Sequence, residues 1–107
     1  MKEYCFEDNV YIDIIQQLNS LLYYNGPVTY LICSDEKIDK CAFNYFNIYF
    51  SKEDPVVDLL LLSKCDYIIG PPSTFSLWAS YYGKVPLFTI KNNQVKLDLQ
   101  DFKISEL

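Results

Sequence analysis

The sequence predicts an α/β domain of the Rossmann type, a doubly wound parallel sheet with helices on both faces. Two observations support this fold class. Segments in which apolar residues recur at helical spacing alternate along the chain with short apolar runs that suit strands. The connections between them are about 2–6 residues long, as in right-handed βαβ units. Half of the 107 residues are hydrophobic, which is ample for the core of one domain over residues 1–107.

The first helix is expected over Tyr11–Leu22, where apolar side chains follow one another three and four residues apart. Asp8 or Asn9 can cap its start. It should end shortly before Pro27, which cannot continue a helix, and Gly26 suits a left-handed backbone at its end.

The remaining elements follow from similar local signals. Val28–Cys33 is a continuous apolar run, typical of a strand buried on both faces, and Tyr45–Phe50 alternates with a period of two. Asp54 and Pro55 have the form of an N-cap and a first helical residue. The other expected elements are helices over Glu36–Ala42, Val56–Cys65 and Ser73–Tyr82 and strands over Asp66–Gly70 and Val85–Ile90. The structure of the tail, residues 92–107, stays open.

Composition excludes several classes of function. The formal charge is −5, and the nine basic residues are scattered lysines, so a nucleic-acid backbone is not an expected partner. The chain contains neither His nor Arg, which removes an imidazole base, a Ser-His dyad, a His metal site and a bidentate Arg clamp. We therefore expect no catalytic residue, no metal and no cofactor.

The cysteines and the most apolar window indicate a cytoplasmic protein. Four cysteines are present without a Cys-x-x-Cys pair, so reduced thiols are expected. No secretory leader is expected after Met1. The window Val56–Ile69 is interrupted by Asp58, Lys64 and Asp66 and is too short to span a membrane. Association with the inner membrane, if any, is expected to be peripheral.

The stretch that ends the strand at Gly70 predicts an anion site. Two prolines follow this glycine, and Ser73 and Thr74 then stand at the start of a helix. Backbone N–H groups and the helix dipole favour an anion at such a place. A diphosphate would meet the hydroxyls of Ser73 and Thr74 and the amides of Phe75 and Ser76. Alternatively, Ser73 or Thr74 only caps its own helix.

Two further expectations concern the rest of this region. Gly83 is a natural residue for the position after a helix. Trp78, Tyr81 and Tyr82 lie at helical spacing and are expected in the core rather than as a stacking platform.

Other loops should reach the same edge. Ligands of doubly wound sheets lie beyond the carboxyl ends of the strands, and the loops expected there are Ser34-Asp35, Ser51–Asp54 and Gly70–Thr74. Asp58 falls in the first turn of the preceding helix. It is either a solvent-exposed acid that favours the helix dipole or a hydrogen-bond acceptor near the ligand.

The run from Asp58 to Ala79 resembles the C-terminal nucleotide-sugar-binding motif of fucosyltransferases, above all those of the bacterial α-1,2 type. It reads Asp-Leu-Leu-Leu-Leu-Ser-Lys-Cys-Asp-Tyr-Ile-Ile-Gly-Pro-Pro-Ser-Thr-Phe-Ser-Leu-Trp-Ala. That family has an acidic residue before a leucine-rich helix that ends near Ser-x-Cys, then a strand, then Ser-Thr-Phe-Ser-x-Trp. Glu7–Tyr11 and Leu31–Asp35 also resemble segments upstream of the motif, so the resemblance covers most of residues 4–90.

The resemblance implies half of a GT-B glycosyltransferase fold, GDP-fucose as donor and a glycan as acceptor. By this analogy Ser73, Thr74 and Phe75 hold the diphosphate, and Asp58 and the Ser34-Asp35 turn lie near the nucleoside.

Two departures from the family set limits to this analogy. Leu77 and Ala79 stand where the family has a Trp and a Gly, and the His-x-Arg-Arg type of catalytic motif is absent. We therefore expect a C-terminal portion that lacks an N-terminal partner domain, binds GDP weakly and transfers no fucose alone. Its uncovered apolar face would favour self-association. The other open interpretation is a small α/β interaction module without a bound nucleotide.

Overall fold

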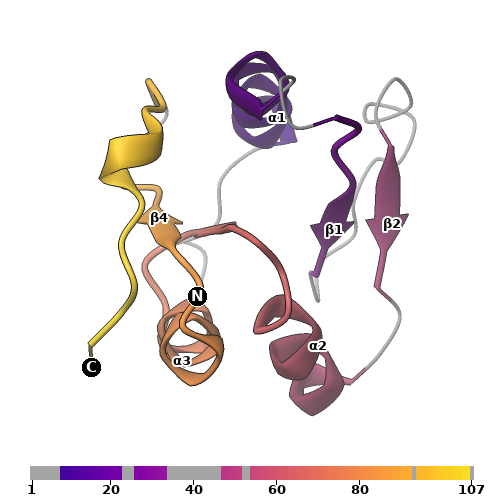
Figure 1. Cartoon of the computed structure of the whole chain (residues 1–107), viewed down its shortest axis with the longest axis vertical. Coiled ribbons are helices and arrows are strands. Elements are labelled where there is room, and N and C mark those ends of the chain that lie inside the picture. Colours follow the sequence, from indigo (N-terminus) through magenta and orange to yellow (C-terminus); the bar gives the residue numbers. More distant parts are fainter. Residues whose placement is uncertain (1–7, 23–25, 34–46, 52–53, 93, 107) are drawn as a thin grey trace.

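The computed structural model describes residues 8–22, 26–33, 47–51, 54–92 and 94–106, and it shows a mixed α/β structure (Figure 1). The elements are, in chain order, α1 (Asp8–Leu22), β1 (Tyr30–Ile32), β2 (Ile48–Phe50), α2 (Pro55–Leu62), β3 (Ile68–Gly70), α3 (Thr74–Gly83), β4 (Leu87–Thr89) and the short 3-10 helix η4 (Leu99–Asp101). The expected helix over Glu36–Ala42 lies outside the described residues. Each strand is shorter than expected. None of the described helices combines the length and the apolarity needed to cross a bilayer.

Local sequence explains where the helices begin and end. Asp54 caps α2 by accepting a 3.0 Å hydrogen bond from the Val57 amide, and Pro55 is the first helical residue, as predicted. α1 begins at Asp8, three residues before the expected start at Tyr11. Gly26 has a φ of 94°, which confirms the left-handed backbone expected of this glycine.

The strands form two separate parallel pairs. β1 pairs with β2, where the amide of Tyr30 donates to Asn47 O at 2.9 Å. β3 pairs with β4, and beyond them Ile90 N donates to Gly70 O at 2.8 Å. The predicted parallel pairing is thus confirmed within each pair. No ladder joins β1 to β3 in the described part of the chain, so one continuous doubly wound sheet stays a prediction.

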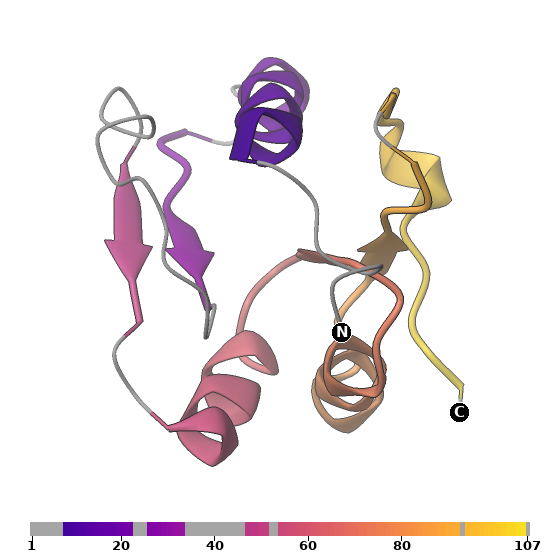
Figure 2. The same cartoon turned by 180° about the vertical axis from the view of Figure 1, so that it is seen from behind.

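Helices cover both faces of the β3–β4 pair. Successive side chains of a strand point to opposite faces. Ile69 and Phe88 pack with the apolar side of α1, whereas Ile68 and Leu87 share a second cluster with residues of α2 and α3. Both views show α1 on one side of the strands and the other two helices on the opposite side (Figures 1 and 2).

The C-terminal tail completes the structure. Leu97 and Phe102 are buried in the cluster around α1, and Lys103 forms an antiparallel bridge with Leu87 on the outer side of β4. Gln17 of α1 binds the tail with both atoms of its amide, donating to Val95 O and accepting from Leu97 N, each at 2.7 Å.

Two expectations about α3 are wrong. Gly83 is the last residue of the helix, and Lys84, with a φ of 55°, takes the left-handed position. The buried face of α3 consists of small residues, Ser76, Ala79 and Ser80. Its three large aromatic residues, Trp78, Tyr81 and Tyr82, are exposed instead of forming core. Small side chains let α3 lie close to β3 and β4, and this packing turns the bulky rings outward.

Candidate functional site

The N-terminus of α3 lies directly after β3. Ser73 is its N-cap, with an extended backbone, and its Oγ accepts a hydrogen bond from the Ser76 amide at 3.4 Å. The Ser73 hydroxyl in turn donates to Ser76 Oγ at 3.4 Å. Ser73 therefore caps its own helix, as the simpler of the two interpretations predicts.

Gly70 brings the helix close to the strand. A Cβ on this glycine would lie 2.4 Å from Ser76 Oγ, so the absent side chain leaves room for the buried Ser76. The amide of Ser76 is bonded to Ser73, whereas the amides of the first two helical residues, Thr74 and Phe75, have no partner among the described residues. Thr74 is exposed, and Phe75 is half-buried.

Asp58 joins three elements. It lies half-buried in the first turn of α2, where its carboxylate accepts a hydrogen bond from the Ser51 hydroxyl at the end of β2. Its negative charge also acts on the thiol of Cys33, which follows β1. The interpretation of Asp58 as a solvent-exposed acid is therefore wrong. Its carboxylate is a hydrogen-bond acceptor whose partner, Ser51, belongs to the same chain.

The two described cysteines have thiols whose pKa is raised. Burial first, and then the negative charges of Asp58 and Cys65 with the Asp58 hydrogen bond, raise the pKa of Cys33 to about 12. Burial, followed by the charge of Asp66, also raises the pKa of Cys65. Both are free thiols, and at neutral pH both are protonated.

The N-termini of α2 and α3 lie at the same edge. The last turns of these helices meet, because a Cβ on Gly83 would lie 2.0 Å from Ser63 O. One turn earlier, Leu59 and Ala79 share the second core cluster. The helices therefore run in the same direction. Ser34 and Asp35 lie outside the described residues.

Lys91 is a candidate that the sequence analysis missed. It follows Ile90, whose amide bonds Gly70 O, so its backbone lies beside the turn that leads into α3. Its side chain is exposed. A basic residue directly after an expected strand was a readable signal, because the carboxyl ends of parallel strands lie together.

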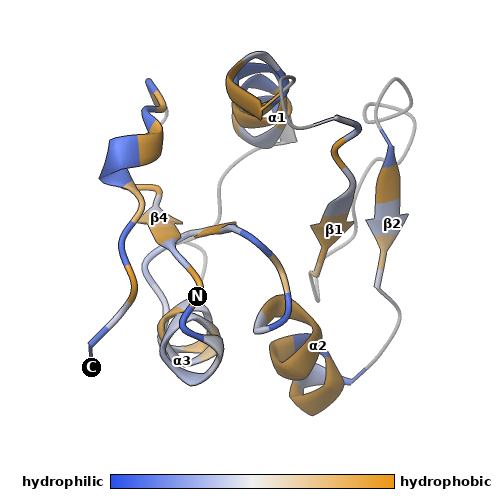
Figure 3. Ribbon diagram, viewed as in Figure 1, coloured by the Kyte–Doolittle hydropathy of each residue, from blue (hydrophilic) through white to orange (hydrophobic). Residues whose placement is uncertain are grey.

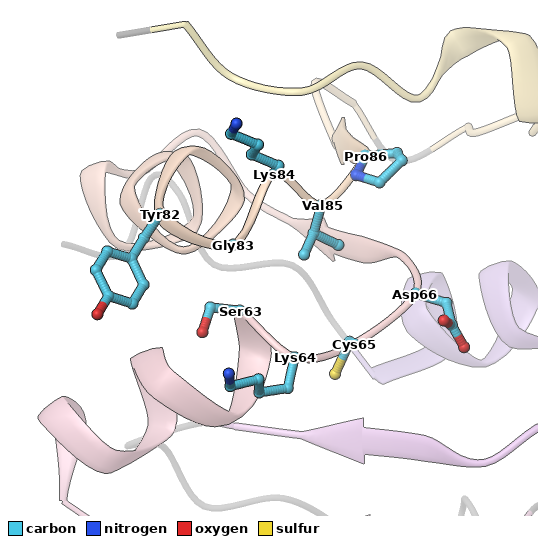
Figure 4. A pocket seen from close by; sticks show the side chains of 9 residues that line it. All are labelled: Ser63, Lys64, Cys65, Asp66, Tyr82, Gly83, Lys84, Val85 and Pro86. Atoms are coloured by element: carbon cyan, nitrogen blue, oxygen red, sulfur yellow. The ribbon is translucent and has the colours of Figure 1, made fainter.

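A cleft of about 570 Å³ lies at the other end of the helices (Figure 4). It opens between the end of α2, at Ser63 and Lys64, and the end of α3, at Tyr82 and Lys84. Helix C-termini carry negative partial charge, which the two lysines offset. The cleft therefore suits a diphosphate less well than the N-terminal edge does.

No group of three or more Cys, Asp and Glu side chains that could hold a metal ion gathers within the described ranges. The candidate site is thus an edge with two free amides, one exposed hydroxyl and one nearby lysine.

Comparison of the chain with family models, with curated proteins and with solved structures gave no match.

Proposed function

We propose that the chain is the donor-binding half of a fucosyltransferase-type glycosyltransferase, and that it holds the diphosphate of a GDP-fucose-like nucleotide sugar at the N-terminus of α3. One observation carries this proposal. The unpartnered amides of Thr74 and Phe75 and the exposed hydroxyl of Thr74 stand together where β3 ends. Ser73 keeps this end of the helix in place by capping it.

The expected affinity is low. A helix N-terminus contributes only about 0.3–1 kcal/mol per exposed charge, or ~2 kcal/mol when partly buried. Lys91 adds one positive charge at this edge, and the chain has no Arg to grip a phosphate with two bonds. A few such donors correspond to a dissociation constant in the millimolar range.

The arrangement of layers is compatible with half of a GT-B fold. The strand pairs are parallel, α2 and α3 run in the same direction on one face, and α1 covers the other. A continuous Rossmann-like sheet would also need β1 to pair with β3. In this proposal Asp58 and the Ser34-Asp35 turn lie toward the nucleoside, and a glycan is the acceptor.

The proposal assigns binding to this chain without catalysis. The sequence contains no imidazole to act as a base and no guanidinium to stabilise the leaving diphosphate. The donor would be held here, and a further domain would supply the catalytic groups.

Titration with GDP followed by amide NMR shifts tests the proposal. We expect the largest shifts at Thr74 and Phe75, with saturation at millimolar GDP. Ser73→Asp retains a good N-cap and places a negative charge against the diphosphate, so it should abolish binding. Ser73→Asn is the matched control, because it caps equally well without charge, and it should bind GDP like the parent chain.

Absence of any shift at millimolar GDP would contradict the proposal. The second candidate, an interaction module without a nucleotide, would then be favoured. The exposed aromatic residues of α3 are the observation that supports this alternative.

A further inference from the structure

The outward side of α2 and α3 is covered by large apolar side chains. Trp78, Tyr81 and Tyr82 lie on α3, and Val56 and Leu60 on α2, each between 43% and 70% exposed. We call these five residues the outer helical face. Their spacing of three and four residues places them on one stripe of each helix, opposite the side that packs on the strands.

The two stripes lie on neighbouring helices, whose last turns meet at Gly83 and Ser63. Leu60 lies one turn before Ser63, whose hydroxyl donates to Leu60 O at 2.6 Å. Ser63 and Lys64 border the cleft together with Tyr82, which reaches it from α3 (Figure 4). The indole of Trp78 contacts Tyr81 edge-to-face, with ring centroids 5.9 Å apart. Because the two rings already contact each other, a partner that covers them meets one joined apolar surface.

The outer helical face carries no charge. α3 has no charged residue, and the one charged residue of α2, Asp58, is bonded to Ser51. Hydropathy colouring shows α2 almost wholly apolar and α3 without a hydrophilic stripe (Figure 3). A solvent-facing helix normally presents polar and charged residues. Since each chain has a formal charge of −5, this is a surface on which two copies can meet without bringing like charges together.

The exposed area approaches what a weak dimer needs. Aromatic side chains bury about 150–250 Å² each, so the three half-exposed rings offer on the order of 300 Å². Val56 and Leu60 bring this to roughly 400 Å². Two copies would bury on the order of 800 Å² from these residues, and the stems of the flanking lysines add to that. The total is near the ~1,000 Å² at which specific interfaces begin.

We propose that a second copy of this chain packs against the outer helical face, related to the first by a twofold axis. We place this axis perpendicular to the helices, which makes the facing helices antiparallel. Lys64 and Lys84, at the C-terminal ends of one copy, then lie toward Asp54, at the N-terminal end of α2 in the other. Opposite charges thus meet at the rim, and the uncharged rings pack at the centre.

Sedimentation velocity across a concentration series tests this proposal directly. We expect a monomer–dimer equilibrium with a dissociation constant of tens to hundreds of micromolar. Trp78 is the one tryptophan of the sequence, so its fluorescence reports on this face alone. Its emission should shift to the blue and become less accessible to acrylamide over the same concentration range.

Substitutions can show whether the dimer forms through the outer helical face or through another surface. Leu60→Lys should weaken the dimer at least about tenfold, because it places an unpaired charge at the centre of the interface. Tyr49→Lys on β2 is the matched control, since Tyr49 is 55% exposed against 43% for Leu60, the change in charge is the same, and the dimer should stay intact. Val56→Lys serves as the second variant where circular dichroism shows Leu60→Lys to be unfolded.

Three results would overturn the inference. One is a chain that stays monomeric up to millimolar concentration. Another is a dimer that forms without a change in Trp78 fluorescence. The third is a dimer that Tyr49→Lys weakens as strongly as the variants of the outer helical face do.

Discussion

Gly83 shows that a glycine can be required for proximity rather than for backbone freedom. It closes α3 with a helical backbone, and its missing side chain lets the helix touch Ser63. The left-handed position falls to Lys84, where an L-residue costs about 1–2 kcal/mol. From the sequence alone, a glycine at a helix end predicts a positive φ, because glycine is the usual residue at that position. The close contact with Ser63, twenty residues earlier, cannot be read from the sequence.

Substitutions at residues 83 and 84 test the close contact of Gly83 and the left-handed backbone of Lys84 separately. Gly83→Ala should lower the free energy of unfolding by about 1–3 kcal/mol, although alanine favours helices, because the new Cβ meets the Ser63 carbonyl. Lys84→Gly should raise it by about 1 kcal/mol by removing the left-handed penalty. Urea denaturation measures both changes. An unchanged or raised free energy of unfolding in Gly83→Ala would show that the close contact is not limiting.

At the scale of elements, features that depend on neighbouring residues were easier to predict from the sequence than features that depend on distant residues. The starts of α2 and α3 follow from Asp54-Pro55 and Ser73, because capping depends on residues three positions apart. Strand ends were less predictable, since a strand stops where its partner stops. The structure of the tail was not predictable at all, because Gln17 holds it across 78 residues of sequence.

The two hydrogen bonds between the Gln17 side chain and the tail can be tested by substitution. Gln17→Leu removes the partners of Val95 O and Leu97 N, and it should lower the free energy of unfolding by about 1–3 kcal/mol. Hydrogen exchange of the Leu97 amide should accelerate. Gln16→Leu, on the exposed side of the same helix, is the control and should change neither quantity. Unchanged exchange at Leu97 in the Gln17 variant would contradict this account of the tail.

At the scale of the whole molecule, the ring of Phe102 is the largest side chain that the tail contributes to the core. Phe102 contacts Tyr67 edge-to-face at 5.2 Å between centroids and Phe88 at 5.6 Å. The sequence predicted the helix N-terminus of the candidate site, because it depends on neighbouring residues. It did not predict the cleft or the engagement of Asp58, because these depend on how separate elements meet.

Removal of this ring tests the role of the tail. Phe102→Ala should lower the free energy of unfolding by about 3–5 kcal/mol, since a large buried side chain is lost and a cavity remains. Ile104→Ala, two residues away and 46% exposed, should cost far less. Thermal unfolding followed by circular dichroism compares the two. A loss in Phe102→Ala as small as that in Ile104→Ala would mean that the ring does not contribute to the core.

Ser80 of α3 limits the substitutions that are tolerated at position 80 and at position 105, near the end of the chain. Its fully buried hydroxyl donates to Val85 O at 2.6 Å and accepts from the Ser105 amide at 2.9 Å. Alanine at position 80 would leave both of these groups without their partner, and a larger residue has no room there. At position 105 only the backbone N–H is used, so every residue except proline can supply the bond. The hydrogen bond between these two residues therefore depends on the side chain at position 80 but only on the backbone at position 105.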